Sequence, residues 1–158
     1  MSPILSKAQM TEEDIKLNYI TPALQSRGWK DKITMETAVQ FTDGKINIQG
    51  NVAVRGEAKK ADYILYINAN YPIAIVEAKK NTLSVAAGLQ QAMAYAQMMD
   101  IPFAYSSNGD AFEEYDFLTG IQRTLPLDGF PTYDELFARY RAEANGGEGL
   151  NDTELTVI

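Results

Sequence analysis

Two apolar segments separated by a tight turn constrain the fold of this chain more than any other feature. Residues 61–69 (ADYILYINA) and 72–79 (PIAIVEAK) are rich in the β-branched and aromatic residues that favour strands. A short connection at residues 70–72 joins them. The run YPIAIV (71–76) is almost continuously apolar, as expected for a buried strand. The two segments therefore predict a hairpin in the middle of the domain.

The segments around this hairpin carry helical and strand patterns. Thr11 is a good N-cap followed by acidic residues, and apolar residues then recur at helical spacing until Gly28, so a helix is expected here. Steps of three and four between apolar residues predict a second helix from about Ser84 to Met99. Further strands are expected at 33–41, 101–107 and 111–119, a turn at Asn108–Gly109 and a last helix at 132–144.

The order of these elements is helix, strands, helix, strand, strand, helix. It predicts an α/β fold in which helices flank a mixed central β-sheet. One domain is expected over residues 1–145, with 146–158 as a polar linker or tail. Residues 45–60 are ambiguous and are expected to hold a short strand and a loop. The N-terminus lacks the apolar core of a secretory signal, and no apolar run could span a membrane, so a cytoplasmic location is expected.

The chain contains no histidine and no cysteine. Disulfides, zinc fingers, thiol nucleophiles and mechanisms with an imidazole base are therefore excluded. No glycine-rich nucleotide-binding loop is present either. A catalytic site would have to use Asp, Glu, Lys, Arg, Tyr, Ser or Thr, together with an oxygen-bound cation such as Mg²⁺. The net charge of −7 argues against a simple DNA-binding module, which is usually basic.

A group of charged residues stands at the end of the second hairpin strand. Alternate side chains of a strand share a face, so Glu77 and Lys79 project side by side from a face that is otherwise buried. Antiparallel pairing can bring Asp62, near the start of the first strand, beside Glu77. Two carboxylates that close would repel unless a divalent cation lay between them.

Two kinds of explanation fit these charges. The pattern Glu-x-Lys is common, and a solvated strand end or a buried salt bridge between Glu77 and Lys79 would account for it without chemistry. Phosphodiester hydrolysis is the alternative, because it needs a cation to acidify a water and benefits from a positioned ammonium. Asp62, Glu77 and Lys79 would supply these parts without a histidine.

The same residues carry a family resemblance. Asp62 followed by Glu77-Ala78-Lys79 resembles the PD-(D/E)xK nuclease motif, with Ala61 in the proline position. QAMAY (91–95) is similar to the Q-x-x-x-Y motif of the RecB-like branch of these nucleases. TEEDIKLNYITPALQSRGW (11–29) resembles the first helix in the N-terminal nuclease domain of type I restriction endonuclease R (HsdR) subunits, and the later motifs follow in that family's order.

The resemblance implies a restriction-endonuclease-like core and a Mg²⁺-dependent DNA endonuclease domain that hydrolyses phosphodiester bonds. It implies that Asp62, Glu77 and the Ala78 carbonyl hold Mg²⁺, and that Lys79 orients or activates the attacking water. Glu13 is expected to be structural, as are Ser107 and Asn108 at their turn. Accessory or DNA-binding roles are implied for four further residues: Glu12, Lys80, Gln91 and Tyr95.

The resemblance also implies partners. These are double-stranded DNA and, through a full-length R subunit, the methyltransferase and specificity subunits of a type I complex. ATP would serve only a motor part that is not visible in this sequence, and no membrane partner is expected. Two alternatives stay open at this point: a catalytically weak nuclease-like domain for docking or DNA binding, and another PD-(D/E)xK nuclease of DNA repair.

Overall fold

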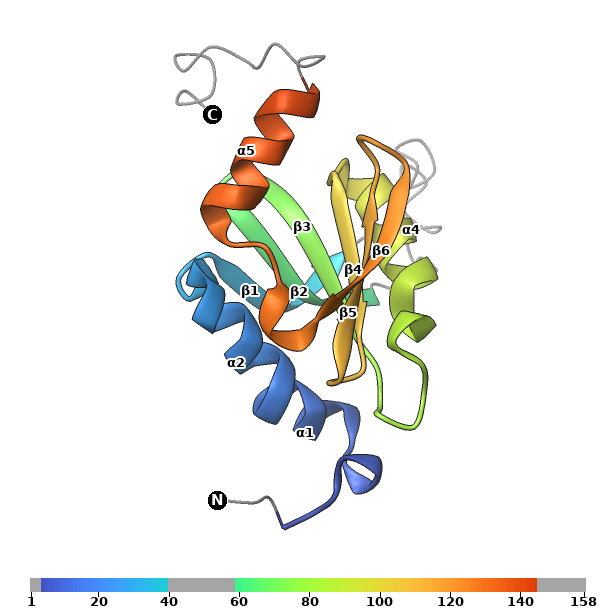
Figure 1. Cartoon of the computed structure of the whole chain (residues 1–158). Helices are drawn as coiled ribbons and strands as arrows, with labels where there is room; N and C mark the ends of the chain where they lie inside the picture. Colours follow the sequence, from blue (N-terminus) through green and yellow to red (C-terminus); the bar gives the residue numbers. More distant parts are fainter. Residues whose placement is uncertain (1–3, 40–58, 145–158) are drawn as a thin grey trace, which may run out of the picture.

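A six-stranded mixed sheet organises the part of the chain that the computed structural model describes, residues 4–39 and 59–144 (Figure 1). The strands follow one another across the sheet in sequence order, and only β3 and β4 pair in parallel. The predicted α/β fold with a mixed sheet is confirmed. The strand bounds are β1 (Ile33–Val39), β2 (Lys59–Asn68), β3 (Tyr71–Ala78), β4 (Phe103–Ser107), β5 (Ala111–Asp116) and β6 (Ile121–Pro126).

The predicted N-terminal helix begins at Thr11. The Thr11 hydroxyl accepts a hydrogen bond from the Asp14 N–H, and the Asp14 carboxylate accepts one from the Thr11 N–H. This reciprocal cap satisfies two backbone donors that a helix start leaves unpaired. The helix continues to Gly28, whose φ of +92° suits a glycine at a helix end. Its segments are α1 (Glu12–Ile15) and α2 (Thr21–Leu24), each followed by wider turns of the π type, Lys16–Ile20 and Gln25–Trp29.

The central hairpin is formed by β2 and β3. Tyr63 pairs with Val76 and Ile64 pairs with Ile75 in antiparallel register. The connection is shorter and earlier than predicted, because the Asn68 side chain accepts a hydrogen bond from the Asn70 N–H and β3 begins at the next residue.

Helices cover both faces of the sheet (Figure 1). On one face, the N-terminal helix and α5 (Tyr133–Ala144) pack against Tyr63 and Val76. On the other face, a 3₁₀ turn (Val85–Gly88) leads into α4 (Leu89–Met99), which packs against Ile64 and Ile75. Adjacent residues of the hairpin therefore point into different cores, as the period of a strand requires.

The strand β6 was not predicted from the sequence. β5 ends at Asp116 rather than at 119, because the Asp116 carboxylate accepts the N–H groups of Leu118 and Thr119 and fixes a turn. β6 follows, and only Leu125 among its residues is buried. A strand that is almost entirely exposed lacks the alternation of apolar and polar residues that sequence reasoning detects.

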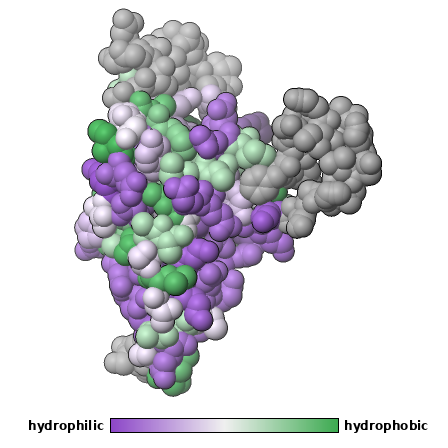
Figure 2. All heavy atoms as spheres, turned by 90° about the vertical axis from the view of Figure 1, so that its right-hand side faces the viewer, coloured by the Kyte–Doolittle hydropathy of each residue, from purple (hydrophilic) through white to green (hydrophobic). Residues whose placement is uncertain are grey.

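Three expectations fall on other parts of the chain. The end of the segment predicted as a strand at 33–41, most of the ambiguous segment 45–60 and the tail 146–158 lie outside the described residues. Within the described residues, no helix is both long and apolar enough to cross a membrane. Figure 2 shows the side that carries α4 and β6, where the coloured apolar residues form small separate groups among hydrophilic ones.

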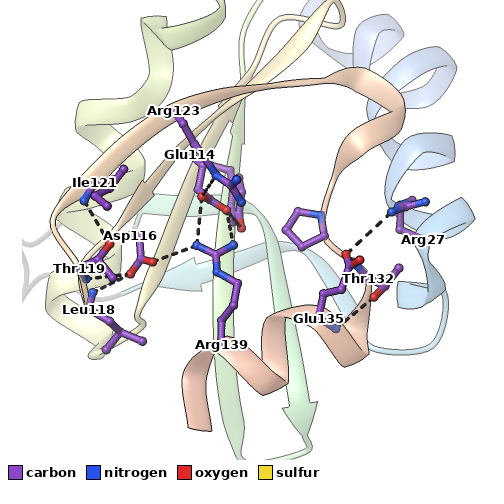
Figure 3. A network of polar contacts seen from close by, with 12 residues as sticks. Arg27, Glu114, Asp116, Leu118, Thr119, Ile121, Arg123, Thr132, Glu135 and Arg139 are labelled. Atoms are coloured by element: carbon purple, nitrogen blue, oxygen red, sulfur yellow. Dashed lines mark hydrogen bonds and ion pairs between the residues drawn. The ribbon is translucent and has the colours of Figure 1, made fainter. Parts of the chain in front are cut away.

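A buried ion cluster fixes α5 to the sheet (Figure 3). The side chain of Glu114 in β5 is 1% exposed and accepts hydrogen bonds from Arg139 at 2.9 Å, Arg123 at 2.8 Å and the Tyr105 hydroxyl at 2.6 Å. Arg139 also binds Asp116 at 2.9 Å. Burial opposes the charge of Glu114, but the hydrogen bonds from Arg139 and Tyr105 outweigh it, so the pKa of Glu114 is lowered.

Replacing Glu114 with glutamine removes the charge from this cluster and keeps its shape. Because Arg139 loses a buried partner, we expect Glu114→Gln to lower the free energy of unfolding at neutral pH by about 3 kcal/mol. Because the pKa of Glu114 is lowered in the folded protein, its charge stabilises the fold at pH values above the ordinary pKa of 4.5, and this contribution is lost as the pH falls below that value. The difference in free energy of unfolding between the two proteins should therefore shrink on acidification. Urea titrations at several pH values measure both effects.

The matched control is Glu113→Gln. Glu113 is the preceding residue of β5 and bonds only to Gln122 and Thr124 on the exposed side of β6. An equal loss of stability in the two variants would contradict the assigned role of the Glu114 cluster.

Candidate functional site

Asp62 and Glu77 form a reciprocal pair across the hairpin. The Asp62 N–H donates to Glu77 Oε2 at 3.0 Å, and the Ala78 N–H donates to Asp62 Oδ2 at 2.8 Å. Each carboxylate is thus held by a backbone group of the opposite strand, next to the paired residues Tyr63 and Val76. The structure brings together the two carboxylates that the hairpin was expected to bring together.

The pair is electrostatically unfavourable. The Glu77 side chain is 3% exposed. Burial, and after it the negative charge of Asp62, raise the pKa of Glu77 to about 8, against the opposing influence of the Asp62 N–H hydrogen bond and, to a smaller extent, of Lys79. A carboxyl in this condition takes up a proton unless a cation compensates its charge. The arrangement therefore favours binding of a positive ion.

Lys79 directly follows the end of β3, and its side chain lies with that of Glu77 beside Gly88. Its backbone N–H donates to the Ser107 carbonyl at 2.9 Å, and its side chain is partly exposed. Lys80 is exposed. Within residues 4–39 and 59–144, neither lysine forms an ion pair, so the salt bridge between Glu77 and Lys79 considered from the sequence is not found. The Lys79 ammonium is therefore not paired with the Glu77 carboxylate.

The wall of the site is a close approach of the 3₁₀ turn to β3 and β4. Ser106 lies beside Glu77 in the parallel register, accepts the Gly88 N–H at 2.8 Å and donates to the Val85 carbonyl at 2.7 Å. A Cβ atom at Gly88 would lie 3.0 Å from Ser106 Oγ and 3.3 Å from both Glu77 Cβ and Lys79 Cγ. These contacts would be tighter than most Cβ atoms make, so a glycine suits this close approach. The sequence analysis singled out neither Gly88 nor Ser106.

Gln91 and Tyr95 lie one turn apart on α4, as predicted from their spacing. The Gln91 side-chain amide donates to the Tyr95 hydroxyl at 2.8 Å, and Tyr95 is 1% exposed within the core between α4 and the sheet. Burial raises the pKa of Tyr95, the Gln91 bond opposes this, and the charges of Glu77 and Asp62 add to it. The Tyr95 ring is therefore both part of the core and within electrostatic reach of the carboxylate pair.

Two asparagines, Asn81 and Asn108, connect the two chain segments that form the rim of the site, residues 80–83 after β3 and 108–110 after β4. The Asn108 side-chain amide donates to the Leu83 carbonyl at 2.7 Å, and Asn81 donates to the Asn108 carbonyl at 2.9 Å. Asn108 also accepts the Asp110 N–H at 3.0 Å. These bonds join the segment after β3 to the turn after β4. The structural interpretation of Asn108 agrees with these contacts.

A buried lysine on the N-terminal helix was missed by the sequence analysis. The Lys16 ammonium lies 3.0 Å from Glu13 Oε2 and 3.3 Å from Asp62 Oδ1, and it also binds Glu36 of β1. Lys16 is 2% exposed. Burial disfavours its charge, but the hydrogen bonds with Glu36 and Glu13 outweigh this and raise the pKa of Lys16.

Of the two glutamates that open the helix, Glu13 is the one that the structure links to Asp62. Glu13 reaches Asp62 through Lys16, whereas no hydrogen bond or ion pair between Glu12 and Asp62 or Glu77 is found in the described residues. The spacing of Glu13 and Lys16, three residues apart, was the signal available in the sequence.

The donors available for a metal are few but suitable. In the described ranges, no group of three or more acidic, histidine or cysteine side chains could hold a metal ion. What remains is the pair Asp62 and Glu77, to which the resemblance adds the carbonyl of Ala78, the residue whose N–H donates to Asp62. Mg²⁺ is commonly held by one or two carboxylates and completes its shell with waters and substrate phosphates. The donor set therefore fits Mg²⁺ better than a metal that requires a full protein cage.

Comparisons with known proteins agree on one family. A model described as "Type I restriction enzyme R protein N terminus" matches residues 32–131. The endonuclease subunit of the type I restriction enzyme EcoAI from Escherichia coli is 34% identical over 158 residues, which are 98% of this chain and 19% of that subunit. A solved fragment assigned to the HsdR subunit of a type I restriction enzyme from Vibrio vulnificus is 37% identical with a TM-score of 0.73, over 92% of this chain and 27% of the fragment. The chain thus spans about a fifth of the length of the E. coli relative.

Gly88→Ala tests the close approach at the wall of the site. The added methyl would press on Ser106 Oγ, which two hydrogen bonds hold in place, so we expect a loss of about 1–3 kcal/mol in the free energy of unfolding. Measuring Gly88→Ala again in a Ser106→Ala background removes the nearest atom, and there the cost should be smaller. Equal costs in the two backgrounds would show that Ser106 does not set the contact.

Proposed function

Because the chain belongs to the family of type I restriction enzyme R protein N termini, we propose that it is a Mg²⁺-dependent DNA endonuclease domain that hydrolyses phosphodiester bonds. The observation that carries this proposal is the pair of Asp62 and Glu77, of which Glu77 is buried, with the Lys79 side chain beside Glu77. This is the set of groups that the PD-(D/E)xK motif combines.

Asp62, Glu77 and the carbonyl of Ala78 would hold the Mg²⁺. The raised pKa of Glu77 supports this assignment, since a divalent cation would remove the repulsion that causes part of it. When bound, the ion would neutralise charge on the phosphate and lower the pKa of a water. The two backbone bonds to the carboxylates keep the pair in place before any ligand arrives.

Lys79 is the group proposed to act on the water or the phosphate. Its ammonium has no ion-pair partner in the described residues, so it is available to orient the water and to stabilise charge that develops during attack. Lys80, exposed on the next position, is suited to contact a backbone phosphate. Gln91 and Tyr95 support the site from α4, and Glu12 is proposed only as an accessory residue.

The substrate and partners follow from the family. We propose double-stranded DNA as the substrate and, for the R protein of which this region forms the N terminus, the methyltransferase and specificity subunits of a type I complex as partners. ATP would be used outside this region. A net charge of −7 does not favour DNA at long range, so the cation and the two lysines would have to provide the local attraction.

Two substitutions test the proposal. Asp62→Asn keeps an acceptor for the Ala78 N–H but removes the charge, and Lys79→Ala removes the ammonium. We expect each to fold and to lower the rate of plasmid nicking in Mg²⁺ by at least about 10²-fold, the usual effect of removing a group that stabilises charge in the transition state. Gel assays of supercoiled DNA measure this rate.

Lys80→Ala is the matched control, because it removes the neighbouring exposed lysine, and its rate should fall far less. Calorimetry adds a second comparison, in which Asp62→Asn should lose binding of Mn²⁺. Continued nicking by both Asp62→Asn and Lys79→Ala would refute the site. A wild-type chain that binds no divalent cation would favour a docking domain without catalysis.

A further inference from the structure

We propose that Lys16 is a positioning residue, whose ammonium sets the orientation of the Asp62 carboxylate and so prepares the carboxylate pair for a divalent cation. The part of this inference that concerns the cation rests on the proposed function. The part that concerns Asp62 rests on contacts within the chain and can be tested without any metal.

Lys16 is buried to a degree that is unusual for a lysine. It is 2% exposed and is the first residue of the π-type turn that follows Ile15. Its side chain lies on the side of the helix that faces the sheet. Lysine is almost never fully buried unless its charge is paired, because a buried ammonium is costly. The position of this side chain is therefore determined by the groups that it binds.

Lys16 supplies the second anchor of Asp62. Oδ2 of Asp62 accepts the Ala78 N–H at 2.8 Å, and Oδ1 lies 3.3 Å from the Lys16 ammonium. With both oxygens engaged, the plane of the carboxylate is fixed. A carboxylate held at one oxygen alone can turn about its last torsion, which is broad in aspartate. The turned carboxylate would present a different edge to a cation.

Glu36 shows that the surrounding structure is arranged around the same ammonium. It lies in β1 between the residues that pair with Tyr63 and Ala61, and therefore faces the position of Asp62. Its φ of +54° is rare for a residue with a side chain and costs about 1–3 kcal/mol. The hydrogen bond from Lys16 to Glu36 is one interaction that compensates for this strain. The helix, β1 and β2 thus converge on one charge.

The contacts of Lys16 distinguish it from a catalytic lysine. An ammonium has three N–H donors, and Lys16 has three acceptors around it, in Glu13, Glu36 and Asp62. No donor is left for a water or a phosphate. Lys79, by contrast, has no ion pair in the described part of the chain. Lys16 is therefore suited to hold Asp62, and Lys79 to act on a substrate.

The first test needs no metal. Lys16→Met removes the ammonium and keeps most of the length of the side chain. The NMR signal of the Ala78 amide proton reports on its bond to Asp62 Oδ2, and we expect it to shift in Lys16→Met and to return toward the wild-type value in Lys16→Arg. Lys7→Met is the matched control, because Lys7 forms an ion pair of 2.8 Å with Asp110, and it should leave the Ala78 signal unchanged.

The second test measures the affinity for Mn²⁺ by calorimetry. Groups that orient a metal ligand typically change metal affinity about 10–100-fold, so Lys16→Met should bind Mn²⁺ more weakly by this factor. Lys16→Arg should recover most of the affinity, and Lys7→Met should match the wild type. A merely structural role would lower the unfolding midpoint of Lys16→Met without weakening the affinity of the folded protein.

The proposal would be overturned if folded Lys16→Met kept the wild-type Ala78 amide signal and the wild-type affinity for Mn²⁺. Tighter binding of Mn²⁺ by Lys16→Met would overturn it as well, because the ammonium would then compete with the cation. If Lys16→Met does not fold, Lys16→Gln, which keeps a donor without the charge, is judged by the same two measurements. If the wild type itself binds no Mn²⁺, the proposed function fails, while the Ala78 signal still decides whether Lys16 positions Asp62.

Discussion

The repulsion between the buried carboxylate of Glu77 and the half-buried carboxylate of Asp62 is the constraint on which the rest of this structure depends. Asp62 and Glu77 are held next to each other by the backbone of the hairpin itself, so neither can move away without breaking a hydrogen bond of the opposite strand. The surroundings then reduce the unfavourable charge. Lys16 reaches the pair from the helix on one side, and the charge of Lys79 acts on Glu77 along β3.

The helices on the two faces of the sheet contribute different residues around the carboxylate pair. The N-terminal helix carries Lys16, whose ammonium binds Asp62. On the other face, the 3₁₀ turn before α4 brings Gly88 close to Glu77 and Lys79. α5 lies with the N-terminal helix, and its Arg139 is paired with Glu114 in a separate buried cluster. The described residues therefore hold a buried cluster of charges around Glu114 and a second one around Lys16, which includes Asp62.

Sequence reasoning succeeded where the physics is local. The hairpin and the meeting of Asp62 with Glu77 follow from a period of two and a short turn, which need no knowledge of the remaining fold. Lys16 could not be found in the same way, since its role depends on π-type turns and on a contact with a residue 46 positions further along the chain. Gly88 required the parallel register of β3 and β4, which no local pattern specifies. β6 was not predicted, because almost all of its residues are exposed and its sequence therefore shows almost no apolar pattern.

The asparagine bonds at the rim have a consequence for the thermodynamics of association. Asn81 and Asn108 connect the backbone after β3 to the backbone after β4, so the segment that begins with Lys80 is ordered before a ligand is present. Ordering loops and side chains on binding is a substantial part of the entropy that a complex loses. Here much of that ordering has already taken place during folding. If DNA is the ligand, as proposed, its association at this rim should be limited by dehydration of the lysines and of the phosphates rather than by loss of backbone entropy.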